Sequence, residues 1–203
     1  MERFSQFLHI REQIASYLST ITEHIQRLGG DAHVSFLHSV EHELLNNDFR
    51  VLVCGEFKRG KSCLINSLLG ASVVPMKVAP CTGTITELKY GQMPFLTIYP
   101  EDTDNFSAPF EDLKNYATIQ GDLGQSLRKV TIEYPSELCR KAITLIDSPG
   151  LNENWSRTKA SLREIATADA LLLVLSCEMA LSRSELEFIN SHLQPYQKRL
   201  FFI

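Results

Sequence analysis

The 203-residue sequence has little of what marks several large classes of protein. Its five cysteines are scattered, with no Cys-x-x-Cys pair and no histidine pattern typical of zinc, which argues against a disulfide framework or a structural zinc site. No stretch approaches the roughly 18 to 20 apolar residues of a membrane-spanning helix. The net charge of -4 argues against nucleic acid as the main partner. Together with the odd cysteine count and the lack of a signal peptide, these features predict a cytoplasmic protein.

The first 47 residues carry a helical pattern of hydrophobic side chains. Apolar residues repeat every seven positions, with a companion series three residues earlier, so both series lie on one helical stripe. The two series are Phe7, Ile14, Ile21 and Leu28, and Phe4, Leu18 and Ile25. Gly29 and Gly30 then favour a turn, and a second amphipathic stretch follows. We expect an antiparallel helical hairpin over residues 1–47. It either covers the core of the main domain or docks onto further helices of this or another chain.

From residue 48 onward, short apolar runs alternate with amphipathic stretches. Strands are predicted at residues 49–53, 84–90, 95–99, 129–134, 142–146, 170–175 and from 200, and helices at 62–69, 156–168 and 182–193. Gly91 and Pro94 predict a hairpin between the second and third of these strands. Ser182 and Glu185 match a capping box at the start of the last helix. The alternation predicts an α/β domain over residues 48–203, with a mostly parallel sheet flanked by helices.

A phosphate-binding loop follows the first predicted strand. The run Gly55-Glu56-Phe57-Lys58-Arg59-Gly60-Lys61-Ser62 satisfies GxxxxGK[ST] and stands between a strand and a helix, as a P-loop must. Its backbone N–H groups and the following helix N-terminus form a site for phosphate, so we expect every residue from Gly55 through Cys63 to bind nucleotide. Lys61 is expected to reach the β- and γ-phosphates, and the Ser62 hydroxyl to bind Mg²⁺.

Two later segments are expected to complete the metal site. Asp147 to Gly150 matches DxxG directly after a predicted strand; Asp147 would hold Mg²⁺ through water, and the Gly150 N–H would sense the γ-phosphate. Between the two motifs, Thr82 is expected to bind Mg²⁺ and to orient the attacking water. Thr84 is the rival for this role. The alternative is that these threonines are simply strand formers.

These segments together resemble the bacterial dynamin-like proteins, which are large GTPases of the dynamin superfamily. The resemblance is carried by FRVLVCGEFKRGKSCLINSLLG at 49–70, Val74-Pro75, Pro80-Cys81-Thr82 and the run at 145–152. It implies a dynamin-type P-loop GTPase domain that binds GTP and GDP, uses Mg²⁺ and forms a homodimer across the nucleotide. It also implies that residues 1–47 belong to a helical neck bundle. In the full-length parent it implies membrane remodelling, through lipid-binding parts outside this chain, at the inner membrane.

The resemblance also directs attention to the basic residues of the loop. Lys58 occupies the position at which eukaryotic dynamins carry a serine that helps to bind a monovalent cation, and at which guanylate-binding relatives carry an arginine finger. We therefore expect Lys58 or Arg59 to supply positive charge to the transition state, beside Lys61 and Thr82 as the other catalytic residues. The alternative is that both basic side chains point to solvent or to a dimer partner.

The part of the site that reads guanine is expected beyond the predicted strand at residue 200. The sequence therefore predicts a C-terminally incomplete domain, in which the residues present do not distinguish GTP from ATP. Three alternatives to a GTPase follow: a P-loop ATPase, a phosphate-binding module that hydrolyses little nucleotide, and a helical interaction module built on residues 1–47.

Overall fold

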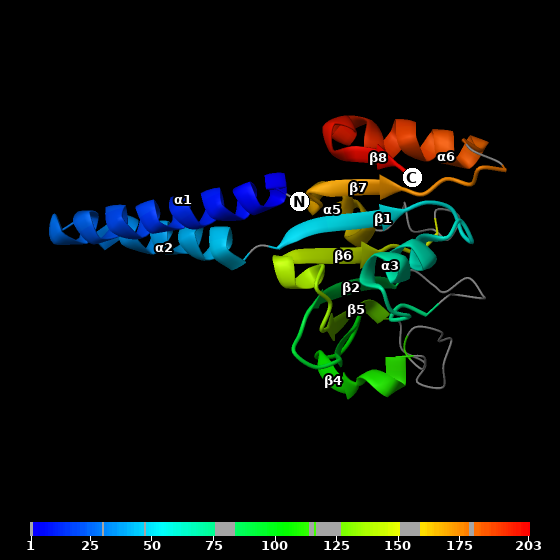
Figure 1. Cartoon of the computed structure of the whole chain (residues 1–203), viewed down its shortest axis with the longest axis horizontal. Helices are drawn as coiled ribbons and strands as arrows, with labels where there is room; N and C mark the ends of the chain where they lie inside the picture. The colour runs from blue at the N-terminus through cyan, green and yellow to red at the C-terminus, as the bar shows by residue number, and fades with distance from the viewer. Residues whose placement is uncertain are drawn as a thin grey trace. The chain divides into compact units, whose positions relative to one another are not determined.

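The computed structural model describes residues 2–29, 31–46, 48–75, 84–113, 116, 127–150, 159–178 and 181–203. The chain divides into two compact units, Met1–Asp48 and Phe49–Ile203 (Figure 1). Among the described residues, no helix is both long enough and apolar enough to cross a membrane.

The first unit is a pair of packed helices, α1 (Glu2–Arg27) and α2 (Asp31–Asn46). On α1, Ala15 and Thr22 are buried and lie seven residues apart, so the buried seam follows a heptad spacing. One of the two predicted heptad series is exposed: Phe7, Ile14, Ile21 and Leu28. The predicted hairpin is thus present, whereas the docking of its apolar stripe onto further helices stays a prediction.

The second unit is built on a mixed sheet of eight strands, in the order β4-β3-β5-β2-β6-β1-β7-β8. The strands are β1 (Phe49–Cys54), β2 (Ile85–Tyr90), β3 (Phe95–Pro100), β4 (Phe106–Pro109), β5 (Leu127–Tyr134), β6 (Ile143–Asp147), β7 (Ala170–Leu173) and β8 (Leu200–Phe202). From β6 through β1 and β7 to β8 the neighbours are parallel, as predicted. Beyond β6 the sheet is mixed, because β2 is antiparallel to β6 and β3 is antiparallel to both of its neighbours.

The predicted hairpin across Gly91 and Pro94 is wrong. Strand β5 lies between β2 and β3, parallel to the first and antiparallel to the second. Four connecting residues easily span the roughly 10 Å between next-nearest strands. The insertion buries Val130 and Ile132 of β5 against Leu88 and Leu96 of its two neighbours. This burial outweighs the local preference for pairing strands that are adjacent in sequence.

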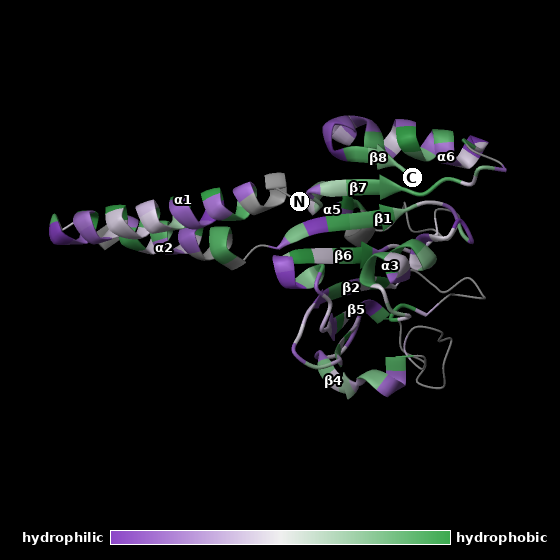
Figure 2. Ribbon diagram, viewed as in Figure 1, coloured by the Kyte–Doolittle hydropathy of each residue, from purple (hydrophilic) through white to green (hydrophobic). Residues whose placement is uncertain are grey.

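Helices cover both faces of the parallel half of the sheet. Alternate β1 residues point to opposite faces: Val53 packs with Ile65 of α3 (Lys61–Leu69), whereas Leu52 packs with Ile165 of α5 (Lys159–Thr167). Phe188 of α6 (Arg183–Phe188) joins the second core. In Figure 2 the hydrophobic colour runs along β7 and most of β1. The two cores fix the carboxyl end of β1 and the start of α3.

The helix predicted at residues 182–193 has a capped start and an irregular end. Ser182 accepts a hydrogen bond from the Glu185 amide, and the Glu185 side chain accepts one from the Ser182 amide, so the capping box is confirmed. The α-helix ends at Phe188 and continues as a π-helical turn at Ile189–Leu193 and a 3₁₀ segment at Gln194–Arg199. Two more 3₁₀ turns lie at Phe110–Asp112 and Cys139–Lys141.

Candidate functional site

The predicted P-loop joins the end of β1 to the start of α3. Gly55 has a φ of 148°, and a Cβ atom on it would lie 2.5 Å from the Val174 carbonyl oxygen. Only glycine therefore allows the loop to leave the sheet beside the chain that continues β7. Burial raises the pKa of the Cys54 thiol to about 12, against a smaller opposing effect of the Lys61 charge, so Cys54 is an inert core residue.

Lys61 is buried within the loop. Its ammonium group donates hydrogen bonds to the Gly55 carbonyl at 3.0 Å and to the Glu56 carbonyl at 2.8 Å. The side chain thus folds back over the loop, and its charge lies among the backbone groups that are expected to surround phosphate.

The two predicted metal-binding motifs meet at one point. The Ser62 hydroxyl donates a hydrogen bond of 2.8 Å to Oδ2 of Asp147. Ser62 lies in the first turn of α3, and Asp147 ends β6 and is 1% exposed. A hydroxyl and a carboxylate are hard oxygen donors, and Mg²⁺ is typically held by one or two such groups with waters and phosphate oxygens. The donor pair fits Mg²⁺.

The DxxG segment also packs against the P-loop. A Cβ atom on Gly150 would lie 2.9 Å from the backbone nitrogen of Phe57. Glycine at this position therefore permits a close approach between two backbones that are distant in sequence. This contact places Gly150 beside the loop, where a role toward phosphate requires it.

The two basic side chains of the loop have different surroundings. Lys58 is exposed, has a φ of 61° in the left-handed region, and places its ammonium 5.5 Å from the centre of the Phe57 ring. Arg59 is half-buried and pairs with two carboxylates: Nη2 lies 2.5 Å from Glu56 Oε2, and Nε lies 3.4 Å from Glu185 Oε1. The two candidates for the catalytic charge are thus separated by their contacts.

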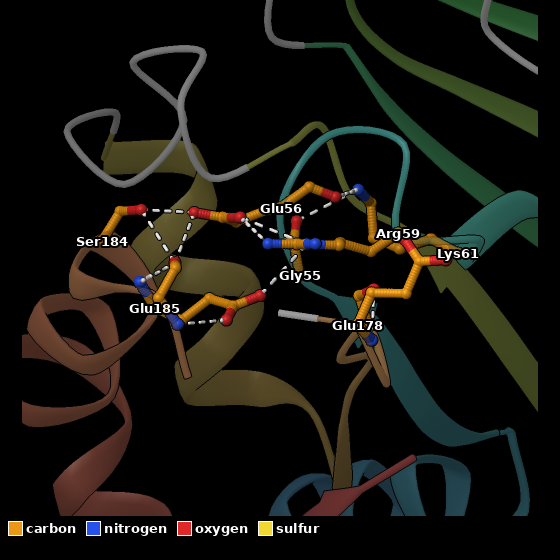
Figure 3. A network of polar contacts seen from close by, with 9 residues as sticks. Gly55, Glu56, Arg59, Lys61, Glu178, Ser184 and Glu185 are labelled. Atoms are coloured by element: carbon orange, nitrogen blue, oxygen red, sulfur yellow. Dashed lines mark hydrogen bonds and ion pairs between the residues drawn. The ribbon is translucent and has the colours of Figure 1, made fainter. Parts of the chain in front are cut away.

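Glu56 connects the loop to the start of α6. Its Oε2 accepts hydrogen bonds from Arg59, and its Oε1 accepts from the hydroxyls of Ser182, at 2.8 Å, and Ser184 (Figure 3). Burial alone would raise the pKa of Glu56. The bonds from Ser184 and Ser182 and the charge of Arg59 outweigh this effect and hold the pKa below its usual range. We refer to Glu56, Arg59, Ser182, Ser184 and Glu185 as the Glu56 cluster.

The remaining predicted site residues are placed as follows. Thr82 lies outside the described residues. Its rival Thr84 directs its hydroxyl to the Leu127 carbonyl at 3.1 Å, a contact that ties the start of β2 to the start of β5. Gly60 has a φ of 91° directly before α3, and Cys63 is exposed on the first turn of that helix.

Asn66 is a residue that the sequence reasoning missed. Its Nδ2 donates to the Val74 carbonyl at 2.8 Å, and its Oδ1 accepts from the amides of Val73 and Val74 at 3.0 and 2.8 Å. These bonds fix the chain where it leaves α3. A weak signal was available, because asparagine is a poor helix former that competes for backbone hydrogen bonds.

A second charged cluster lies at the other end of β1. Arg50 donates to Glu87 at 2.9 Å and to Glu164 at 2.6 Å, and Lys129 donates to Glu87 at 2.9 Å. Burial alone would raise the pKa of Glu87, but the hydrogen bond and charge of Lys129, with the charges of Lys89 and Arg50, hold it below its usual range. We refer to Arg50, Glu87, Lys129 and Glu164 as the Arg50 cluster.

Comparison with known proteins gives consistent matches. The model of the Dynamin family matches residues 51–203. The chain is 29% identical to a bacterial dynamin-like protein of Nostoc punctiforme, over 100% of this chain and 32% of the relative. It is 30% identical to dynamin-like protein 2 of Campylobacter jejuni, over 84% of this chain and 29% of the relative. It thus spans about a third of the length of these relatives.

Solved structures agree with the sequence matches. A bacterial dynamin, described as an oligomerised pair for long-range sensing and tethering of membranes, has a TM-score of 0.58 and 26% identity, over 93% of this chain and 33% of that one. LeoA, a bacterial dynamin GTPase from ETEC, has a TM-score of 0.51 at 17% identity and supports the fold alone. With a family model that matches most of the chain, the conclusion is direct: this chain belongs to the dynamin family.

Proposed function

We propose that residues 49–203 bind GTP with Mg²⁺ and hydrolyse it to GDP and phosphate. The observation that carries this proposal is the 2.8 Å contact between Ser62 of the P-loop helix and Asp147 of the DxxG motif. It joins, at one point, two oxygen donors that are 85 residues apart in sequence. Membership of the dynamin family supports guanine nucleotide as the ligand.

Each residue then has a role in phosphoryl transfer, which depends mainly on positioning and on charge. Lys61 moves from the loop carbonyls to the β- and γ-phosphates and neutralises them. Ser62, and Asp147 through water, would hold Mg²⁺, which would neutralise charge on the phosphate oxygens. Gly150 donates its N–H to the γ-phosphate, and Thr82 orients the attacking water.

We further propose that Lys58, rather than Arg59, supplies the additional catalytic cation. Lys58 is exposed at the turn of the loop and is not held by an ion pair among the described residues. Arg59 would first have to leave both Glu56 and Glu185. Such a departure leaves two carboxylates without their cation, which is costly in a poorly solvated site.

The direct test is nucleotide binding and turnover by the purified chain, with GTP, GDP and ATP, with Mg²⁺ or with EDTA. We expect Mg²⁺-dependent release of phosphate from GTP. Lys61→Ala should weaken binding by about 100-fold or more, which corresponds to the loss of a buried charge from the phosphate site. Lys198→Ala, which removes an exposed lysine, is the matched control. Tight GTP binding without turnover would instead indicate a binding module, and equal affinity for GTP and ATP would indicate an incomplete base site.

In a protein of its relatives' full length, we propose that GTP drives dimerisation of this domain across the nucleotide face and thereby remodels a membrane. The support is the similarity to a bacterial dynamin described as an oligomerised pair that tethers membranes. We place this activity at the cytoplasmic face of the inner membrane, with lipid contacts outside residues 1–203. Sedimentation with GDP and aluminium fluoride should show a dimer that GDP alone does not produce. A monomer under both conditions would contradict the proposal.

A further inference from the structure

The Glu56 cluster joins the two ends of the variable part of the P-loop to each other and to the start of α6. Glu56 and Arg59 are the first and the last of the four variable residues between Gly55 and Gly60. Their side chains pair at 2.5 Å and so connect the two ends of the variable segment. This ion pair therefore closes the turn that residues 56–59 form.

The same cluster anchors the loop to a separate part of the fold. Ser182 and Ser184, at the start of α6, both donate to the carboxylate oxygen of Glu56 that Arg59 does not use. Glu185, which is fully buried, approaches Arg59 from the same turn and also caps the helix (Figure 3). The loop is therefore held from outside by α6, more than 120 residues later in the sequence.

We propose that the Glu56 cluster is a clamp that holds the P-loop in its phosphate-binding curvature, with Glu56 and Arg59 as positioning residues. This inference rests on the proposed nucleotide-binding function and adds how the loop is kept in shape. A loop fixed in advance does not lose conformational freedom when phosphate binds, and this preorganisation appears as affinity. Residues of the clamp should thus determine how tightly nucleotide is held, whereas Lys58 should determine how fast it is cleaved.

A catalytic Arg59 makes the opposite prediction. If Arg59 touched the γ-phosphate, Glu56 would compete for it, and removal of the Glu56 charge would preserve or increase turnover. In a clamp, Glu56 and Arg59 share the ion pair that closes the loop, so this part of the effect is lost in either single variant and the double variant loses less than the sum of the two. Losses confined to the transition state lower kcat, whereas losses of uniform binding raise KM.

The test compares Glu56→Gln, Arg59→Met and the double variant in the full chain. We expect each to raise the KM for GTP and the Kd for GDP by about tenfold, with kcat within about threefold of the wild type. The loss of affinity in the double variant should be smaller than the product of the two single losses. Ser184→Ala should also weaken nucleotide binding, whereas Ser184→Thr, which retains the hydroxyl, should bind nucleotide as tightly as the wild type. Arg183→Ala, an exposed neighbour on α6, is the matched control.

Hydrogen exchange gives a readout that does not need turnover. The clamp predicts faster amide exchange at both residues 56–61 and 183–186 in Glu56→Gln and Arg59→Met, but not in Arg183→Ala. If the wild type fails to hydrolyse GTP, the proposed GTPase function is wrong, while this measurement still tests the clamp. The clamp is overturned by a kcat loss in Arg59→Met of about 100-fold at constant KM, as for a catalytic cation. Additive effects in the double variant, or wild-type binding and exchange in both single variants, would also overturn it.

Discussion

The two charged clusters at the ends of β1 are similar in chemistry but differ in what surrounds them. The Arg50 cluster joins β1, β2, β5 and α5, and its cations outnumber its carboxylates once Lys89 is included. In the Glu56 cluster, one guanidinium faces two carboxylates, and the cluster lies beside a phosphate-binding loop. The first has the contacts of a fold-holding network. The second has the position of a network that serves a site.

This difference indicates how one strand serves two purposes. Glu87 is 2% exposed on the sheet, where a carboxylate is tolerated only with close cations. Its partners Arg50, Lys129 and Lys89 come from the strands that must assemble around it, so these ion pairs stabilise the fold. The partners of Glu56 come from the loop itself and from the start of α6, so these contacts stabilise the conformation of the loop. Variants in the Arg50 cluster should therefore change the free energy of unfolding, whereas variants in and beside the Glu56 cluster should change nucleotide binding or turnover.

The largest effect is expected at Lys58. Lys58→Ala should lower kcat for GTP by about 10³-fold, roughly 4 kcal/mol of transition-state stabilisation, and leave KM and thermal stability unchanged. Lys58→Arg should retain most of the activity, because it keeps the charge. Single-turnover hydrolysis at saturating GTP is the measurement. Wild-type turnover in Lys58→Ala would leave the loop without its proposed second cation.

The next effect tests the fold-holding end of β1. Glu87→Gln should lower the free energy of unfolding by about 3 kcal/mol, because removing one partner of a buried ion pair costs about 3 to 5 kcal/mol and the cations here are partly exposed. Urea denaturation is the measurement, and kcat per folded molecule should not change. Glu137→Gln, which breaks an exposed pair with Arg140, is the control and should cost no more than about 0.5 kcal/mol. A loss of GTP affinity in Glu87→Gln without a loss of stability would remove the distinction between the two clusters.

Features that depend on a few neighbouring residues could be predicted from the sequence, whereas features that depend on distant partners could not. The P-loop, the strand before it and the capping box at Ser182 are patterns within a few residues, and all three are present in the structure. The insertion of β5 between β2 and β3 depends on partners about 40 residues away, so the Gly91 turn pointed to the wrong pairing. Strand β4 was not predicted either; it has four residues, and its edge position gives it one neighbour among the described strands.

The candidate site shows the same limit. The motifs predicted that Lys61, Ser62 and Asp147 lie close together, because the P-loop and the DxxG motif each follow a strand of the parallel half of the sheet. No motif indicated that Glu56 would bind Ser182 and Ser184, because serine at a helix start is already explained by capping. Nor could sequence separate Lys58 from Arg59, since both are basic residues of one loop. Their difference arises because Arg59 pairs both with Glu56 and with Glu185, and Glu185 is 126 residues from Arg59 along the chain.

A smaller effect is expected where the chain leaves α3. Asn66→Ala removes three hydrogen bonds from Val73 and Val74, and should lower the free energy of unfolding by about 2 kcal/mol, mostly from amides left unpaired. Ser67→Ala on the next, exposed position should change stability by about 0.5 kcal/mol at most. If Asn66→Ala weakened GTP binding but left the free energy of unfolding unchanged, Asn66 would belong with the residues that shape the nucleotide site and not with those that hold the fold.

The smallest effect is the pH dependence that Glu87 gives to stability. Its pKa is lowered in the folded state by Lys129, Lys89 and Arg50, against the effect of burial. The stabilisation is therefore complete above the unfolded-state pKa of about 4.3 and is lost as the pH falls through the folded-state value.

Urea titrations between pH 7 and pH 3 should show a steeper loss of stability with falling pH in the wild type than in Glu87→Gln. Glu56 also has a lowered pKa, so an acid-sensitive slope should persist in Glu87→Gln and become flatter in the variant that also carries Glu56→Gln. Equal slopes in the wild type and Glu87→Gln would mean that the pKa of Glu87 is the same in the folded and the unfolded chain, and the cations of the Arg50 cluster would then only offset the cost of burying this carboxylate.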